Sequence, residues 1–204
     1  MYTVVGHPNS RAIRALWALE EMKLDYTLQI AFPGSEAVEQ VNPSRKVPVL
    51  LDGDFAIPDS VAIITYLADK HGQLTYPAGT QDRATQDSLT QFTVDEIEGP
   101  LWLAARHSFV LPEDKRVAGV KATAQWEFAR SCEVLKKRMS DGPFLMGDKM
   151  TIADIIAGHS AGWAKNAGFD WPDGPVGDYF ERMQANETLA TARAKGKAAL
   201  DAAG

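Results

Sequence analysis

The chain of 204 residues is 45% hydrophobic and 24% charged, an ordinary globular composition that allows one large domain or two small ones. The formal net charge is −6. Residues 1–80 have 6 basic and 9 acidic side chains, and residues 81–204 have 15 and 18, so neither part has surplus basic charge to neutralise phosphates. Nucleic acid and anionic membranes are therefore not expected as partners. The single cysteine, Cys132, excludes an internal disulfide and a CxxC motif, and no stretch is long and apolar enough to cross a bilayer, so we expect a cytoplasmic protein without a bound metal.

Strand and helix patterns alternate over short distances in the first part of the chain. Asp52-Gly53 between two apolar runs predicts a hairpin, and Gly72 is suited to end a helix. The resulting order, βαβ-α-ββα, is typical of an α/β domain. The expected strands are 2–5, 26–30, 48–52 and 55–58, and the expected helices are 11–21, 36–41 and 60–71.

The stretch "GQLTYPAGT", residues 72–80, has the composition of a linker and separates two predicted domains, 1–77 and 83–204. Beyond it the strand alternation disappears, and the pattern favours helices throughout. The Ala-rich stretch "ATARAKGKAAL" near the end predicts a solvated terminal helix. The expected helices of the second domain are 82–108, 112–140, 151–167, 175–186 and 188–202.

The stretch "NPSRKVPVLL" places a proline at the start of a strand, where its missing N–H is tolerated. A trans bond before Pro48 is the default, because only about 5 to 6% of such bonds are cis. A cis Val47–Pro48 bond would turn the N–H and C=O of Val47 away from the sheet. An extended peptide-like ligand would then pair with them as a short extra strand.

The stretch "IPDSVAIITYL" puts an acid beside a helix start at Ser60. Free N–H groups and the positive end of the helix dipole make such a start a carboxylate site, and Asp59 suits a ligand ammonium. Together the two suit the zwitterionic end of an α-amino acid. The alternative is only an N-cap serine next to a dipole-favoured aspartate.

Two other stretches place polar groups at helix starts. In "GHPNSRAIRAL", the polar His7, Asn9 and Ser10 lie between a strand and a helix, either facing a ligand or, for Ser10, simply capping the helix. In "MTIADIIAG", Thr151 and Asp154 have the spacing of a capping box, which is a folding signal rather than a site.

Taken in order, these stretches resemble a cytosolic glutathione S-transferase of bacterial type over essentially the whole chain. The matching pieces are "RAIRALWALEEMKLDY", "NPSRKVPVLLDGDFAIPDSVAIITYL" and "FLMGDKMTIADIIAG", of which the middle one is the most specific. The resemblance implies an α/β plus all-α fold, with a thioredoxin-like N-terminal domain that binds glutathione and an α-helical bundle that supplies a pocket for a small hydrophobic electrophile. It also implies a cytoplasmic homodimer active in detoxification.

The resemblance assigns the glutathione-binding residues. Pro48 becomes the cis-proline, and Val47 pairs its backbone with the cysteinyl part of glutathione. Asp59 and Ser60 hold the γ-glutamyl amine and carboxylate, and Lys46 lies near the glycyl carboxylate. The family usually has Glu or Gln before that serine, so Asp59 is one methylene shorter than the usual side chain.

The required chemistry is activation of a thiol, because the thiolate is the nucleophile and a free thiol of pKa about 8.5 is only a few per cent ionised at neutral pH. A hydrogen bond to the sulfur together with the dipole of the first helix lowers that pKa. Tyr2 lies too early to match the tyrosine-type classes. Ser10 is the first expectation for the donor, and Asn9 and His7 stay open.

In the second domain, "PLWLAARHSFVL" places several candidate pocket residues on related turns of one helix. Trp102 and Phe109 would line an apolar electrophile pocket, and Arg106 or His107 would meet glutathione or developing negative charge. The alternative is an aromatic stripe that belongs to the core.

The expected function is therefore a glutathione transferase that stabilises the thiolate of glutathione and conjugates it to a small electrophile. Peroxidase, isomerase and dehalogenase reactions stay within this class, because loops and pocket shape decide the electrophile. The alternative is a glutathione-binding or scaffold protein of the same fold without transferase activity. The missing CxxC argues against a thioredoxin-like oxidoreductase.

Overall fold

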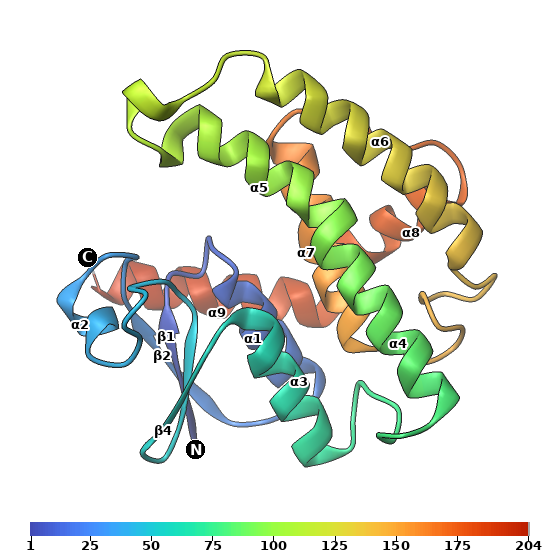
Figure 1. Ribbon diagram of the computed structural model, residues 1–204. Helices are drawn as coiled ribbons and strands as arrows, with labels where there is room; N and C mark the ends of the chain where they lie inside the picture. Colours follow the sequence, from blue (N-terminus) through green and yellow to red (C-terminus); the bar gives the residue numbers. More distant parts are fainter. Residues whose placement is uncertain (204) are drawn as a thin grey trace. The chain divides into compact units, whose positions relative to one another are not determined.

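The computed structural model describes residues 1–203, and its chain forms two compact units (Figure 1). The first unit contains Met1–Pro77 together with the segment from Ala185 onward, and the second contains Ala78–Gln184. Among the helices of residues 1–203, none combines the length and the apolarity that a bilayer crossing requires.

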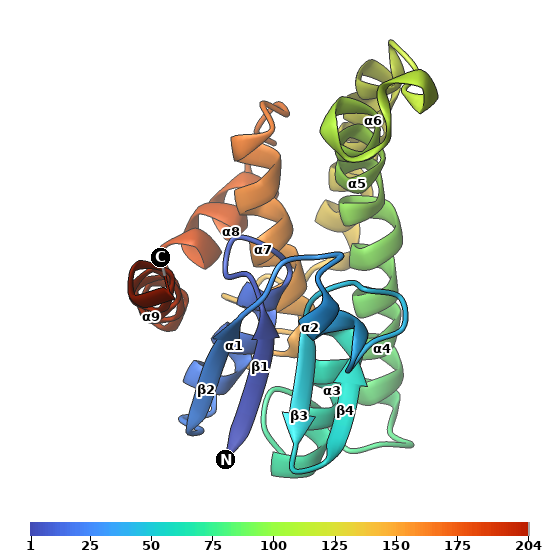
Figure 2. The ribbon, with the colours of Figure 1, turned by 90° about the vertical axis from the view of Figure 1, so that its left-hand side faces the viewer.

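The first unit is built on a mixed sheet of four strands, in the order β2-β1-β3-β4 (Figure 2). β1 and β2 run parallel, whereas β3 is antiparallel to both β1 and β4. The predicted strands are confirmed to within one residue at each end. They are β1 (Tyr2–Gly6), β2 (Tyr26–Ile30), β3 (Val49–Asp52) and β4 (Phe55–Pro58).

Helix α1 (Ala12–Glu21) is the centre of the first unit. Its residues from Ala12 to Leu19 are all buried, because α1 packs against both α3 (Ser60–His71) and α9 (Glu187–Ala203). A helix that is covered on several sides needs apolar residues around its whole circumference. The stretch "AIRALWAL" meets this requirement at every position except Arg14. The short helix α2 (Glu36–Glu39) lies between β2 and β3 in the chain.

Helix α9 differs from the solvated terminal helix that the sequence predicts. Leu189, Ala192 and Gly196 are buried along one face, and this face packs on α1 and β2. These residues recur at intervals of three and four positions, so they share one side of the helix. The helix therefore belongs with the first unit, whereas the sequence places it in the helical domain 83–204.

The second unit is all helical, as predicted. The expected helix 82–108 is one run of helical turns that contains two wide π-helical segments. The expected helix 112–140 is too long, because its first part holds only a short 3-10 turn and the α-helix begins after Gly119, whose φ is 87°. Its helices are α4 (Gln81–Phe92), η1 (Thr93–Glu98), α5 (Gly99–Ala105), η2 (Arg106–Val110), η3 (Glu113–Lys115), α6 (Val120–Arg138), α7 (Ile152–Asn166) and α8 (Pro175–Gln184).

The predicted capping box at the start of α7 is confirmed. Asp154 Oδ2 accepts hydrogen bonds from the N–H of Thr151 at 2.8 Å and from its hydroxyl at 3.0 Å. The other oxygen, Oδ1, accepts from the N–H of Leu145 at 2.8 Å and from the hydroxyl of Tyr179 at 2.9 Å. This buried carboxylate therefore joins α7, α8 and the preceding loop, which is more than a cap does.

Candidate functional site

The register of the sheet brings three predicted site segments to one end. Val49 of β3 pairs with Val5 of β1 on one side and with Pro58 of β4 on the other. The chain continues from this row as Gly6 and the turn 7–10 after β1, the segment 46–48 before β3, and Asp59 and Ser60 after β4. Because adjacent strands lie about 5 Å apart, the three segments are neighbours in space.

Gly6 allows two of these segments to approach closely. A Cβ atom at this position would lie 3.1 Å from Cβ of Ala12, 3.4 Å from Cβ of Val47 and 3.6 Å from Cα of Pro48. A larger side chain at Gly6 would therefore push the turn away from the segment 46–48.

The peptide bond between Val47 and Pro48 is cis, as the resemblance predicts. Pro48 is buried and Val47 is half-buried. Within residues 1–203, neither the N–H nor the C=O of Val47 has a hydrogen-bond partner. Unpaired backbone groups beside a strand are able to accept an added extended segment.

Lys46 and Asn42 shape the segment before Val47. Asn42 is buried, and its Nδ2 donates to the carbonyl of Lys46 at 2.8 Å while its Oδ1 accepts from the N–H and the hydroxyl of Ser44. The side chain of Lys46 is exposed and has no partner among the described residues. The sequence analysis missed Asn42, although Asn-Pro-Ser is a recognisable turn signal of the kind in which the Asn side chain bonds its own backbone.

Asp59, not Ser60, caps α3. Its φ of 77° is in the left-handed region, and its Oδ1 accepts from the N–H groups of Val61 at 2.8 Å and Ala62 at 3.1 Å. Two of the amides that would hold a ligand carboxylate are therefore already paired. The N–H of Ser60 has no partner in residues 1–203, so it is the amide left for a ligand.

The hydroxyl of Ser60 is tied to a buried arginine. Ser60 is 2% exposed and Arg14 of α1 is 1% exposed, and Nη1 of Arg14 donates to Oγ of Ser60 at 3.2 Å. A buried guanidinium makes the surroundings of Ser60 favourable for an anion. The sequence analysis missed Arg14, whose signal is a single charge inside the apolar run "AIRALWAL".

The turn after β1 carries the three candidate thiol donors, and they are bonded differently. The hydroxyl of Ser10 donates to the carbonyl of His7 at 2.6 Å and accepts from the N–H of Ala12 at 3.1 Å. Nδ1 of His7 accepts from the N–H of Asn9 at 3.2 Å, and its ring lies 5.0 Å from that of Phe32. The side-chain amide of Asn9 is exposed and has no partner in the described chain.

The candidate pocket residues of the second unit fall into two groups. Phe109 is 69% exposed and lines an apolar cavity of about 190 Å³ together with Trp163, whereas Trp102 lies outside this cavity with its ring 6.3 Å from that of Trp163. Nδ1 of His107 accepts from the N–H of Val117 at 3.1 Å, so this side chain holds the loop before α6. The guanidinium of Arg106 is exposed.

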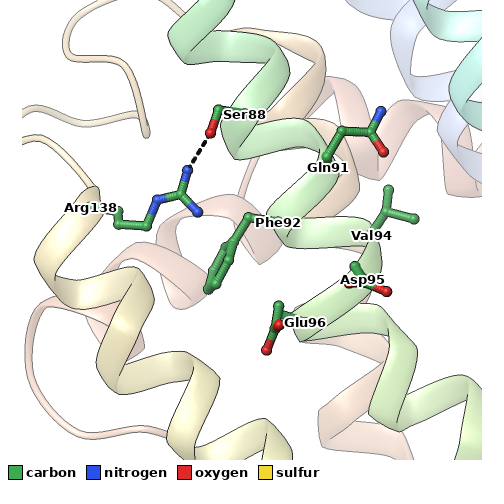
Figure 3. A pocket seen from close by; sticks show the side chains of 7 residues that line it. All are labelled: Ser88, Gln91, Phe92, Val94, Asp95, Glu96 and Arg138. Carbon is green, nitrogen blue, oxygen red and sulfur yellow. Dashed lines mark hydrogen bonds between the residues drawn. The ribbon is translucent and has the colours of Figure 1, made fainter.

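A larger hollow of about 430 Å³ lies between α4, η1 and α6 (Figure 3). Arg138 crosses it, donating to the hydroxyl of Ser88 at 2.8 Å with its guanidinium 4.6 Å from the ring centre of Phe92. Asp95 and Glu96 of η1 complete its polar lining.

The single cysteine, Cys132, is buried, and the residues that the structure describes contain no cluster that could bind a metal ion. Burial raises the pKa of Cys132 to about 12, so its thiol stays protonated at neutral pH. No group of three or more His, Cys, Asp or Glu side chains arranged to hold a metal ion occurs within residues 1–203.

The first unit, a four-stranded mixed sheet with a cis-proline beside unpaired backbone, has the thioredoxin-like fold, and the second unit is all helical. The family model "Glutathione S-transferase, N-terminal domain" matches residues 4–75, and the model "Glutathione S-transferase, C-terminal domain" matches residues 99–183. The chain belongs to the glutathione S-transferase family, and the family and fold expected from the sequence are confirmed.

Curated relatives and solved structures agree with this assignment. Glutathione S-transferase theta-1 of Bos taurus is 34% identical over 129 residues, which are 60% of this chain and 54% of the relative, so the chain spans about half the length of the curated relatives it matches. A glutathione transferase from Methylococcus capsulatus is 25% identical with a TM-score of 0.82, covering 97% of this chain and 99% of that one. A theta-class enzyme from Xanthomonas axonopodis pv. citri, solved with glutathione bound, is also 25% identical, with a TM-score of 0.74 over 94% of this chain and 96% of that one.

Proposed function

We propose that this chain is a glutathione transferase that binds glutathione at the end of its sheet and conjugates it to a small electrophile. The observation that carries the proposal is the row of paired strand residues at this end of the sheet, because three kinds of group lie next to it. They are the unpaired backbone of Val47, the carboxylate of Asp59 beside the unpaired N–H of Ser60, and the unpaired side-chain amide of Asn9. A γ-linked tripeptide with a central thiol needs these three kinds of group side by side.

Each part of glutathione finds a chemical match. The backbone of Val47 would form hydrogen bonds with the cysteinyl residue, and Oδ2 of Asp59 would accept a hydrogen bond from the γ-glutamyl ammonium group. The N–H and hydroxyl of Ser60, backed by the guanidinium of Arg14, would hold the γ-glutamyl carboxylate. Lys46 would approach the glycyl carboxylate, because its ammonium is exposed beside Val47.

We assign the bond to the sulfur to the amide of Asn9 rather than to Ser10. The one hydroxyl proton of Ser10 already bonds the carbonyl of His7 at 2.6 Å, whereas Asn9 has two N–H donors without partners in the described chain. Nδ1 of His7 serves as an acceptor within the turn. With Nδ1 accepting, the Nε2–H of His7 is also free to donate, so Asn9, with two free donors, is ranked ahead of His7, with one, and both are ranked ahead of Ser10.

The reaction is a nucleophilic substitution or addition by the thiolate. The thiol proton leaves to solvent, and sulfur forms a bond to the electrophilic carbon. In a substitution the leaving group departs with its electron pair, whereas in an addition the π bond of the electrophile breaks and its electron pair takes up a proton from solvent. Each unit by which the site lowers the thiol pKa reflects about 1.4 kcal/mol of preferential thiolate stabilisation. The amide of Asn9 and the N-terminal end of α1 supply that stabilisation.

For the electrophile, the cavity beside Phe109 and Trp163 is the candidate binding surface of the second unit. Arg106 has an exposed guanidinium that suits developing negative charge. Trp102 contributes through Trp163, and His107 keeps the role of a loop anchor.

A charge-only change tests the glutathione site. Asp59→Asn keeps an oxygen for the N–H groups of Val61 and Ala62 but removes the negative charge that binds the amine. We expect calorimetry to show about tenfold weaker glutathione binding. Asp54→Asn is the matched control, since it makes the same charge change in the exposed hairpin of the same unit and is expected to leave the affinity unchanged. Equal affinities for both variants would contradict the placement of glutathione.

Activity is tested separately with glutathione and a chloronitrobenzene, followed by absorbance. Conjugation together with ultraviolet absorbance of bound thiolate at neutral pH is the expected result. Tight glutathione binding without thiolate absorbance would instead favour the scaffold function.

We also propose that the chain forms a homodimer through α4, η1 and α6. The exposed side of α6 combines Trp126, which is 63% exposed, with basic residues, and the neighbouring α4 and η1 are acidic. A two-fold axis would set each basic helix against the acidic pair of the other copy. The basic residues are Arg130, Lys137 and Arg138, and the acidic ones are Asp82, Asp87 and Asp95.

Sedimentation measurements test this interface. Trp126→Glu is expected to weaken the dimer at least about tenfold, because it puts a charge at the centre of the contact. Val117→Glu makes the same kind of change at a side chain that is 57% exposed in the loop before α6, outside the three helices of the proposed contact, and is expected to leave the dimer intact. A wild-type monomer, or equal effects of both variants, would contradict the proposal.

A further inference from the structure

The terminal helix touches the turn that carries the candidate thiol donors. A Cβ atom added to Gly196 of α9 would lie 2.6 Å from Cβ and 3.4 Å from Cγ of Pro8. Carbon atoms in contact are normally about 3.5 to 4.0 Å apart, so a methyl group at this position does not fit. Both residues are buried, and the ring of Pro8 offers no flexible end that moves aside easily.

Pro8 sits inside the turn itself. The N–H of Ser10 donates to the carbonyl of His7 at 3.0 Å, which closes a four-residue turn with Pro8 in its second position and Asn9 in its third. Proline fixes φ at its own position, so a shift of its ring moves the peptide that leads directly to Asn9. The contact with Gly196 therefore limits where the Asn9 side chain points.

The helix that carries Gly196 is itself anchored on α1. Nε1 of Trp17 donates to Oδ1 of Asn186 at 3.2 Å and to the hydroxyl of Thr188 at 3.0 Å. Closer to Gly196, Nζ of Lys195 lies 2.6 Å from Oε1 of Glu20. Because both the start and the middle of α9 are held, the helix does not simply back away from Pro8.

We propose that Gly196 is a positioning residue for thiol activation: by letting α9 seat directly on Pro8, it fixes the turn so that Asn9 reaches the sulfur. This inference rests on the proposed transferase function and deepens it, because it gives the end of the chain a part in the chemistry. The tripeptide itself is held by Val47, Asp59 and Ser60, which Gly196 does not touch. Loss of the contact should therefore affect ionisation of the thiol more than binding.

The test variant is Gly196→Ala in the full chain. We expect the midpoint of the pH profile of kcat/KM to rise by about one unit and the activity at pH values below both midpoints to fall about tenfold. The dissociation constant of glutathione, measured at a pH below the midpoint where the bound sulfur is still a thiol, is expected to stay within about twofold of the wild-type value, because a displaced donor weakens only the binding of the thiolate. Ala194→Ser, on the exposed side of α9, is the control and should change neither quantity.

A compensating pair separates this contact from general damage to the helix. In a Pro8→Gly background the opposing Cβ is absent, so Gly196→Ala no longer meets an obstacle there. We expect the pH midpoint to be the same with and without Gly196→Ala in that background, within about 0.2 units. A full additional shift would overturn the proposal, because the effect would then not pass through Pro8.

Backbone amide resonances give a readout that does not depend on activity. Gly196→Ala should move the signals of His7, Asn9 and Ser10 while those of the hairpin 52–55 stay in place. Unchanged turn signals, or an unchanged pH profile in an active variant, overturn the positioning role and leave the transferase function standing. A wild-type chain that does not bind glutathione overturns both.

Discussion

A hydroxyl has one proton to donate and a side-chain amide has two, and this difference separates Ser10 from Asn9. The proton of Ser10 is committed to the carbonyl of His7. We predict that Asn9→Ala raises the pKa of bound glutathione and lowers kcat/KM at neutral pH by about tenfold to a hundredfold. Ser10→Ala should leave the thiol pKa unchanged and cost about 1 kcal/mol of stability through the lost turn bonds. The pH dependence of kcat/KM and a denaturant titration measure the two effects. A raised thiol pKa in Ser10→Ala alone would show that the hydroxyl turns toward the ligand.

Asp52 offers a prediction on stability and pH. Hydrogen bonds from Lys70 and from the hydroxyl of Tyr66, the latter at 2.6 Å, lower the pKa of its carboxyl group. A lowered pKa in the folded state stabilises the protein above the unfolded value of about 3.9, and the contribution is lost as the pH falls through the folded pKa. The free energy of unfolding of the wild type should therefore exceed that of Asp52→Asn near pH 6 and converge with it in acid. The effect is small, because the carboxyl group is only partly buried and solvent screens its interactions. Parallel curves for the wild type and Asp52→Asn would contradict the assignment.

At the level of single residues, sequence reasoning located segments better than contacts. The positions of Val47, Pro48 and Ser60 came from a recognised pattern. The bond from Arg14 to Ser60 and the cap made by Asp59 depend on how α1, α3 and the sheet pack together. Tertiary packing decides these side-chain directions, so a one-dimensional pattern does not contain them.

At the level of helices, Asp154 is the most consequential single side chain outside the site. Four donors from Thr151, Leu145 and Tyr179 converge on its buried carboxylate. Asp154→Ala removes a cap and leaves buried donors unpaired, so we predict a loss of about 3 to 5 kcal/mol in the free energy of unfolding. Asp148→Ala, exposed in the preceding loop, is expected to change it by less than about 0.5 kcal/mol. Chemical denaturation measures both, and a loss below about 1 kcal/mol would reduce Asp154 to an ordinary cap.

Periodicity and turn chemistry predict most elements of the fold. The alternating burial of β2 and the Asp52-Gly53 hairpin between β3 and β4 follow directly from local patterns. The start of α6 was missed, because Gly119 adopts a left-handed conformation inside a stretch of good helix formers. The burial of α9 was missed for another reason: small residues such as Ala192 and Gly196 give a weak amphipathic signal even when their face is fully covered.

At the scale of the molecule, a segment from the far end of the chain completes the first unit. Leu16 and Trp17 of α1 are fully buried, and α9 packs on this helix. A chain that ends after Gln184 would leave apolar surface of α1 exposed and lose the bonds of Trp17 to Asn186 and Thr188. We predict that the first unit of such a chain is destabilised by about 3 kcal/mol or more.

Because the chain forms two units, the stability of each unit can be measured separately in one sample. Hydrogen exchange of the strand amides in β1 and β3 should become much faster in the chain that ends after Gln184, while the amides of α7 keep their protection, because α7 belongs to the other unit. Glutathione binding should be lost with the strands. A chain that ends after Leu200 removes only the end of α9 and should behave as the wild type. Strand amides that stay protected without α9 would mean that the predicted domain 1–77 is stable without this helix.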